Sequence, residues 1–517
     1  MPIKTDATLT PQKLVPQIER LFELSAGKIL SLEKTWKPAD GAPVFTVQGR
    51  YTARGWTEWT QGFQFGSALL QFDATGDEQF LEIGRRNTIE RMAPHVSHTG
   101  VHDHGFNNIS TYGNLWRLMR EGKIPLNERE KDFYELALKV SGAVQAARWT
   151  RLADGTGFIH SFNGPHSLFV DTVRSLRSLA VAHQLGHVLM GEQDAKVSLL
   201  QRLVQHALNT ARYCVYYGEG RDAYDVRGRT AHEAVFNTAS GVFRCPNTHQ
   251  GFSPFSTWTR GLAWAICGFA EQLEFLRTVA QEEFEDATAG GRWAQLYRDL
   301  TRTRRGRHRP RWVKTAYSLG KAPAEKALAA FREAAVATAD FYLAHCCADG
   351  IPMWDTAAPN LHRLPANYLA KRSEPFNRWE PVDSSAAAIA AQGLWRLGNY
   401  WASLAGAPLK SRRSASGFGP RTSDLARRYR QAALTIANTL FSEPYLSTNP
   451  RHHGLLLHSV YHRPNGWDFV APGQNVPNGE SSLWGDYHAR ELALLLWRAA
   501  RGEAYPTFFD QPPRHTA

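Results

Sequence analysis

The sequence predicts an all-α protein whose helices pair into a toroid of six hairpins, an (α/α)6 barrel. Apolar residues repeat at helical spacing through most of the chain, whereas continuous alternating strand patterns are few. The connections between the helical segments share a loose pattern, and no linker is clean enough to split the chain. We therefore expect residues 1–517 to form a single domain.

The helical segments number about a dozen when the chain is read for apolar periodicity. Two short series show the helical spacing most clearly, namely Leu14, Ile18, Leu21 and Phe22, and then Phe133, Leu136, Val140 and Val144. Further helical patterns cover roughly Glu78–Met92, Asp171–Leu189, Ala195–Tyr217, Thr257–Thr278, Pro323–His345, Asp383–Ala402, Asp424–Phe441 and Ser482–Arg501.

A repeated pattern in the connections suggests how these helices are arranged. A Gly-bearing turn leads to polar or aromatic residues and then to a helix rich in small residues in three stretches: DGTGFIHSF (Asp154–Phe162), RGRTAHEAVFN (Arg227–Asn237) and DGIPMWDTAAP (Asp349–Pro359). This pattern suits paired helices in a ring, with the inner helices opening at one end where the loops gather functional side chains.

The composition is that of an ordinary globular protein, with 43% hydrophobic and 21% charged residues. No run of about 18 apolar residues is present, so we expect no membrane-spanning helix. The first residues lack the apolar region of a secretory signal. The five cysteines are odd in number and scattered, and they include a vicinal pair, which indicates no disulfide framework. These features favour a cytoplasmic protein.

Much of the net charge of +12 comes from two basic segments, RTRRGRHRPRWVK (Arg302–Lys314) and KSRRSASGFGPR (Lys410–Arg421). Both are rich in Gly, Ser or Pro, so we expect basic surface loops near 302–320 and 408–422. Binding of nucleic acid or another polyanion is the alternative, but no motif of a DNA- or RNA-binding domain accompanies them. A mildly positive field would also attract an anionic sugar.

The stretch GVHDHGFNN (Gly100–Asn108) places Asp103 between His102 and His104. Three interpretations compete: a metal site, a capped loop, or half of an acid/base pair. Histidines at 95, 98, 102 and 104 have spacings that could hold zinc, but no cysteine accompanies them and the HExxH pattern is absent. We therefore expect neither a metal nor a cofactor.

A possible partner for Asp103 is Asp171, which interrupts the apolar stretch FVDTV at the start of a predicted helix. Taken alone, Asp171 is better explained as a helix cap, a role worth about 1 kcal/mol. Two carboxylates in unlike surroundings can instead divide acid and base roles, because burial and mutual repulsion raise the pKa of one of them. The sequence does not place the two side chains together.

Two aromatic stretches offer groups that suit a sugar acid. In STWTRGLAW, Arg260 and Trp264 are four residues apart and so share one face of a helix. A guanidinium suits a carboxylate, and an indole suits the face of a sugar ring. Trp59 and Phe63 in WTQGF admit the same interpretation. The alternative for both stretches is structural packing.

Seven short motifs together resemble the unsaturated glucuronyl hydrolases of glycoside hydrolase family 88. They follow the order of that family over nearly the whole chain: WTQGF (Trp59–Phe63), HDHGF (His102–Phe106), FVD (Phe169–Asp171), STWTRGLAWAICGFA (Ser256–Ala270), GIPMWD (Gly350–Asp355), VDSSAAAIAAQGL (Val382–Leu394) and NGESSLWGDY (Asn478–Tyr487). The resemblance implies an (α/α)6 barrel, in agreement with the helical pattern.

The resemblance also implies a role for each candidate residue. Asp171 matches the general acid/base and Asp103 the assisting carboxylate, with His102 and His104 as the hydrogen-bonding surroundings of Asp103. His102 is also expected to bind substrate. The other matches, all expected to bind substrate, are His232 and Gln250 lining the site, Arg260 and Trp264 at the substrate carboxylate and the attacking water, and Trp59 and Phe63 at the sugar.

The implied reaction is hydration of the vinyl ether in a 4,5-unsaturated uronic acid at the non-reducing end of a di- or oligosaccharide. Asp171 would protonate C4, and water would add at C5 before the sugar opens. This requires a protonated Asp171, which an apolar site and an ionised Asp103 would both favour. We expect a monomer or small homo-oligomer that binds neither nucleic acid nor membrane.

Two other functions remain open on the sequence. One is a different carbohydrate-active enzyme on the same barrel, such as an inverting glycosidase, a polysaccharide lyase or an epimerase. The other is a protein without catalytic activity that binds polyanions through its Arg-rich loops.

Overall fold

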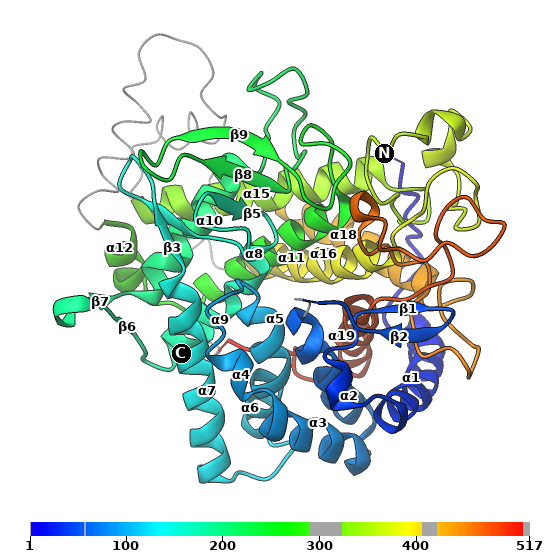
Figure 1. Ribbon diagram of the computed structural model, residues 1–517, viewed down its shortest axis with the longest axis horizontal. Coiled ribbons are helices and arrows are strands. Elements are labelled where there is room, and N and C mark those ends of the chain that lie inside the picture. Colours follow the sequence, from blue (N-terminus) through cyan, green and yellow to red (C-terminus); the bar gives the residue numbers. More distant parts are fainter. Residues whose placement is uncertain (1, 56–57, 290–322, 406–420, 510–517) are drawn as a thin grey trace.

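The computed structural model describes residues 2–55, 58–289, 323–405 and 421–509. Over these ranges the chain forms two concentric layers of helices (Figure 1). The outer helices are α1 (Val15–Thr35), α3 (Glu78–Arg91), α7 (Glu128–Ala147), α10 (Leu199–Tyr213), α15 (Pro323–His345) and α18 (Arg421–Leu440). The inner helices are α2 (Gln61–Thr75), α5 (His104–Asn108) continued by α6 (Asn114–Arg120), α8 (Thr172–Ser175) continued by α9 (Arg177–Gln184), α11 (Thr259–Leu276), α16 (Ser384–Ala405) and α19 (Leu483–Arg501).

The inner helices close into a ring. Each contacts the next along the chain, and α19 returns to contact α2. In Figure 1 the C-terminal α19 (red) accordingly lies beside the N-terminal α1 and α2 (blue). Outer and inner helices alternate along the chain, so the described residues form an (α/α)6 barrel, and the predicted fold class is confirmed.

Small residues allow the inner helices to approach closely. Helix α16 begins SSAAAIAAQG, a run of good helix formers with little side-chain bulk. A Cβ at Gly393 would lie 2.7 Å from the Cα of Cys267 on α11, so glycine is required at this crossing. The close contact fixes α16 against α11.

Strands are short and lie in the connections. They are β1 (Phe45–Val47), β2 (Arg50–Thr52), β3 (Trp149–Arg151), β4 (Gly157–Ile159), β5 (Ser167–Phe169), β6 (Leu189–Met190), β7 (Lys196–Val197), β8 (Glu233–Phe236) and β9 (Phe243–Asn247). All their pairings are antiparallel, in hairpins except for the three-stranded order β5-β8-β9. Two shorter helices, α4 (Ala93–Val96) and α12 (Gln281–Ala289), complete the α-helices of the described residues.

Most predicted helices are present, with three differences. The segment predicted as one helix over Asp171–Leu189 is broken between α8 and α9 and ends at Gln184. Helices α2 and α5–α6 were not predicted, because they are buried on nearly every side and lack a polar face. Helix α7 buries Tyr134 and Leu138, whereas Leu136 of the apolar series is 60% exposed.

Both basic segments expected as surface loops lie outside the described residues, apart from the start of α18 at Arg421. Within the part of the chain that the structure describes, no helix is long and apolar enough to cross a membrane.

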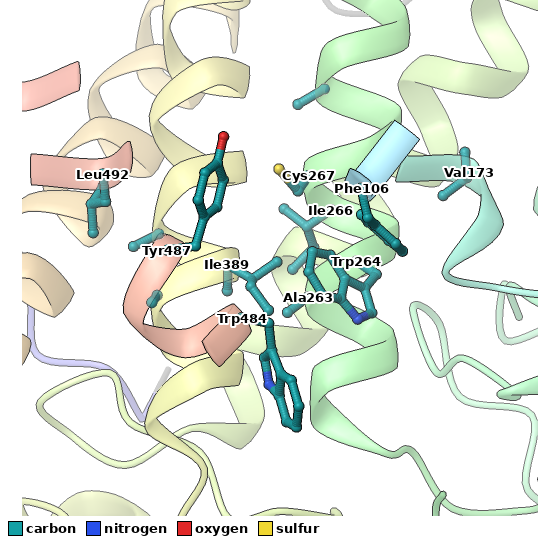
Figure 2. Close-up of a cluster of buried hydrophobic side chains, with 14 of the residues drawn as sticks. Phe106, Val173, Ala263, Trp264, Ile266, Cys267, Ile389, Trp484, Tyr487 and Leu492 are labelled. Atoms are coloured by element: carbon teal, nitrogen blue, oxygen red, sulfur yellow. The ribbon is translucent and has the colours of Figure 1, made fainter. Parts of the chain in front are cut away.

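An apolar cluster lies among the inner helices (Figure 2). It combines Trp264 and Ile266 of α11, Ile389 of α16 and Trp484 of α19 with Phe106 of α5. The rings of Phe106 and Trp264 are 4.8 Å apart. This cluster supports the helix starts at one end of the barrel.

Further along the same helices, buried charges connect the inner layer. Glu271 on α11 accepts a hydrogen bond from Arg174 on α8 and lies 3.7 Å from Arg396 on α16 and 4.0 Å from Arg177 on α9. Glu491 on α19 pairs with Arg174 at 3.6 Å. These side chains are almost completely buried, so each charge depends on its partners for stabilisation.

We therefore predict that Glu271→Leu lowers the free energy of unfolding by about 3–5 kcal/mol, because it leaves buried arginines uncompensated. Denaturant unfolding followed by circular dichroism measures the change. Glu282→Gln on the exposed surface of α12 is the matched control and should not move the midpoint. Equal midpoints for Glu271→Leu and the unmodified protein would contradict the role of this network.

Candidate active site

A cavity of about 480 Å³ lies where the inner helices begin. Its walls come from the segments that lead into α2, α5, α8 and α11 and from the loop that follows residue 460. Its lining residues are Glu58, Trp59, His98, Gly100, Val101, His102, Asp103, Phe106, Phe162, Phe169, Asp171, His249, Gln250, Trp258, Arg260, Trp264, Tyr461, His462, Asn465 and Trp467. The volume is that of a typical small-molecule site.

Asp103 and Asp171 both line this cavity and are each 7% exposed. Asp103 precedes α5 and Asp171 precedes α8, so both stand at the cap position of an inner helix. Neither carboxylate makes a capping hydrogen bond. The explanation of Asp171 as an ordinary helix cap is therefore wrong, because its side chain is directed to another partner.

The imidazole of His102 joins the two carboxylates. Its Nε2 lies 3.3 Å from Oδ1 of Asp171 and 3.7 Å from Oδ1 of Asp103. The backbone N–H of Phe162 donates to Nδ1 at 3.3 Å, which directs the ring proton to Nε2. His102 therefore donates a hydrogen bond to Asp171 from a buried position beside a second carboxylate.

The two carboxylates differ in acidity. Burial raises the pKa of Asp103, and the charge of Asp171 adds to the rise against the opposing effect of His102. Burial also acts to raise the pKa of Asp171, but the hydrogen bond and charge of His102, together with His232 and Arg260, outweigh it and lower that pKa. Burial alone would lower the pKa of His102, yet the two carboxylates raise it.

This order is the reverse of the expected one, in which an ionised Asp103 keeps Asp171 protonated. The expectation is wrong for the unliganded cavity because the hydrogen bond from His102 goes to Asp171. In the free protein, Asp171 is the stronger acid and Asp103 holds a proton more readily.

The histidines around Asp103 do not converge on a common point. His104 contacts Ser141 Oγ at 3.0 Å and the carbonyl of His98 at 2.9 Å. Asn107 Nδ2 lies 3.2 Å from Nδ1 of His95. No group of three or more potential metal ligands occurs among the described residues.

Arg260 and Gln250 form another wall of the cavity. Nη2 of Arg260 donates to Oε1 of Gln250 at 2.6 Å and to the carbonyl of Tyr461 at 2.8 Å. Nη1 donates to the carbonyl of Val460 and lies 3.5 Å from Asp383. The bond to Arg260 orients the Gln250 amide, so its N–H groups are the donors that Gln250 can offer the cavity.

Arg260 was expected to hold the substrate carboxylate. In the structure, both of its terminal nitrogens already bond to acceptors of the protein itself. Its guanidinium carbon lies over the rings of Trp258 and Trp484, at 4.6 and 4.7 Å from their centroids. Arg260 still supplies positive charge to the cavity wall, as its effect on the pKa of Asp171 shows.

Of the four other expected binding residues, Trp59 and Trp264 line the cavity, whereas Phe63 and His232 do not. Phe63 is fully buried behind Trp59, with an edge-on ring contact of 6.1 Å. His232 accepts the backbone N–H groups of His249 and Gln250 at 3.0 and 3.3 Å. Phe63 and His232 therefore support residues that reach the cavity.

One wall went unrecognised in the sequence. Tyr461, His462 and Trp467 line the cavity from a loop held by Asp468, which accepts the N–H groups of Tyr461 and His462 at 2.5 and 3.0 Å. Helical spacing cannot mark a loop, and the only signal was the density of ring side chains in YHRPNGW.

Comparisons with known proteins agree with this architecture. The chain is 24% identical over 465 residues to an unsaturated glucuronyl hydrolase from Bacillus sp. strain GL1, covering 88% of this chain and 90% of the relative. It is also 24% identical over 443 residues to one from Formosa agariphila, covering 84% and 78%. The chain is similar to unsaturated glucuronyl hydrolases.

The solved structures give the same result for the fold. The crystal structure of an unsaturated glucuronyl hydrolase specific for heparin superimposes with a TM-score of 0.62 and 19% identity, covering 95% of this chain and all of that one. This likeness supports the barrel over nearly its full length. No protein-family model matches the chain.

Proposed function

We propose that the protein is a glycoside hydrolase of the unsaturated glucuronyl hydrolase type, in family 88. It releases a 4,5-unsaturated uronic acid from the non-reducing end of oligosaccharides that polysaccharide lyases produce. The observation that carries the proposal is the pair of buried, uncapped carboxylates, Asp103 and Asp171, on either side of His102. The similarity to two enzymes of that name supports it.

The cavity suits a sugar acid. Trp59, Phe162 and Trp264 give it apolar faces that can pack on a pyranose ring. The amide N–H groups of Gln250, fixed by Arg260, are suited to donate to the substrate carboxylate, and the buried guanidinium favours its charge. An unsaturated uronic acid presents a flat ring and one carboxylate, which match these groups.

Proton transfer to carbon begins the proposed reaction. Protonated Asp171 donates to C4 of the vinyl ether, and positive charge develops at C5 and the ring oxygen. Water adds at C5, and the carboxylate of Asp171 accepts its proton. The resulting hemiketal opens, which releases the partner sugar and a 4-deoxy-5-keto uronate. Asp103 and His102 set the charge around Asp171 during these steps.

Because Asp171 is ionised in the free protein, substrate must bind together with a proton. The uronate brings a negative charge into a cavity that already contains two carboxylates, and it displaces water. Both effects raise the pKa of Asp171. The productive complex therefore contains a protonated Asp171, although the free enzyme does not.

The proposal also covers the functional unit of the protein and its location in the cell. We propose that residues 1–517 act as one catalytic unit, as a monomer or small homo-oligomer in the cytoplasm. The five free cysteines, four of them buried, are compatible with a reducing compartment. The residues given a catalytic role need no metal or cofactor for this chemistry.

The direct test uses a panel of unsaturated disaccharides made by lyases from glycosaminoglycans and other polysaccharides. We expect loss of the ultraviolet absorbance of the conjugated alkene with at least one of them. Asp171→Asn should lower kcat by about 10²–10⁴-fold with a small change in KM, because the proton donor is lost.

Phe255→Ala, on an exposed ring that does not line the cavity, is the control and should leave kcat unchanged. The catalytic assignment fails if the enzyme turns over a disaccharide and Asp171→Asn retains most of that activity. Cleavage of saturated glucuronides at a comparable rate would instead overturn the proposed reaction.

A second test uses the pH dependence of kcat/KM. The productive form carries a proton that free Asp171 loses above its lowered pKa, so kcat/KM should fall as pH rises. His102→Gln removes the positive charge of His102, which helps to lower this pKa, so the fall should move to higher pH. An unchanged profile, or a shift to lower pH, would show that His102 does not set the acidity of Asp171.

A further inference from the structure

We propose that Ser175 and Gln145 are positioning residues that set the separation of Asp103 and Asp171. The inference rests on the proposed function and deepens it, because it identifies what aligns the two catalytic carboxylates. Neither residue lines the cavity, and both are completely buried.

The hydroxyl of Ser175 makes three hydrogen bonds at the contact between α8 and α5. It donates to the carbonyl of His102 at 2.7 Å and accepts the backbone N–H of Gly105 at 2.8 Å. It also accepts from Nε2 of Gln145 at 3.0 Å. One side chain on the helix that follows Asp171 therefore holds the backbone on both sides of Asp103.

Gln145 brings the outer helix α7 into the same cluster. Its Nε2 donates to the carbonyl of His102 at 2.8 Å as well as to Ser175. Its Oε1 accepts from the hydroxyl of Ser178 on α9. The His102 carbonyl thus accepts two buried hydrogen bonds, which fix the backbone from which the imidazole and Asp103 project.

The backbones at this contact are as close as their atoms allow. A Cβ at Gly105 would lie 2.1 Å from the carbonyl oxygen of Ser175 and 2.6 Å from its Cα. Only glycine permits this approach. Nε of Arg177 also donates to the Gly105 carbonyl at 2.7 Å. The spacing between the segment of Asp103 and that of Asp171 is therefore set by the backbone contact and the Ser175 cluster.

The distance between Asp103 and Asp171 matters because the charge of each carboxylate acts on the other and on His102, which lies between their segments. The hydrogen bond from His102 to Asp171 is 3.3 Å, so a small displacement of α5 would weaken it. The charged and titratable neighbours of the pair are His102, His232 and Arg260 around Asp171, and His102, Arg148 and His98 around Asp103. Of these groups, His102 alone contacts both carboxylates: it donates a hydrogen bond to Asp171 and lies 3.7 Å from Asp103.

The test compares Ser175→Ala and Gln145→Met with Ser25→Ala. Ser25 is an equally buried serine on α1 that accepts one hydrogen bond from Arg490, so its loss costs similar packing away from the cavity. We expect both cluster variants to lower kcat by about 10–100-fold with little change in KM, because the carboxylates are misplaced. Their pH profiles of kcat/KM should shift, and Ser25→Ala should shift neither kcat nor the profile.

A second measurement needs no substrate. Spectra of the protein labelled with ¹³C-histidine, with the His102 signal assigned by His102→Gln, give the His102 titration directly. The two carboxylates raise the pKa of His102, so this pKa should fall in both cluster variants and remain unchanged in Ser25→Ala. If Ser175→Ala does not fold, the titration of His102 in Gln145→Met tests the positioning role on its own.

The outcomes separate the two proposals. An active unmodified enzyme whose cluster variants keep its kcat, pH profile and His102 titration would overturn the positioning role. An unmodified enzyme inactive on every unsaturated disaccharide would overturn the proposed function, and the His102 titration would still decide whether the cluster sets the spacing.

Discussion

The site depends on one buried imidazole shared by two carboxylates. His102 donates to Asp171 and lies beside Asp103, and all three side chains are nearly inaccessible to water. Two carboxylates so close together would not both ionise without a cationic or hydrogen-bonding partner. His102 supplies it, and the N–H of Phe162 fixes which nitrogen of the ring does so.

The barrel makes this arrangement possible because its inner helices all begin at the same end. Asp103 and Asp171 directly precede two of them, and Arg260 lies in the first turn of a third. The apolar cluster around Trp264 and the arginine–glutamate network hold those helices in register. Side chains distant in sequence therefore meet with little freedom to move.

The sequence contained most of the fold and part of the site. Periodicity identified the helices with one polar face, but not α2 or α5–α6, whose surroundings are apolar on nearly all sides. The candidate residues were identified individually, yet His102 and Asp171 are 69 positions apart and only the closed ring brings them together. The order of the pKa values of Asp103 and Asp171 was predicted wrongly, because it depends on which carboxylate accepts the hydrogen bond from His102.

Residue type and spacing alone also do not show which side-chain atoms are free to bind substrate, as Phe63 and Arg260 illustrate. Residue type and spacing suggested sugar and carboxylate contacts for both. In the structure, Phe63 is behind Trp59, and Arg260 uses its terminal nitrogens on protein acceptors. A side chain's type shows what it can bind, but its neighbours decide whether those atoms are available.

Transfer of a proton from Asp171 to carbon is the central claim, and turnover in heavy water tests it most directly. If one fixed carboxylic acid protonates C4, the keto product should contain one deuterium at C4, on a single face, as mass spectrometry and NMR would show. A product without deuterium at C4, or with deuterium on both faces as first formed, would contradict the account.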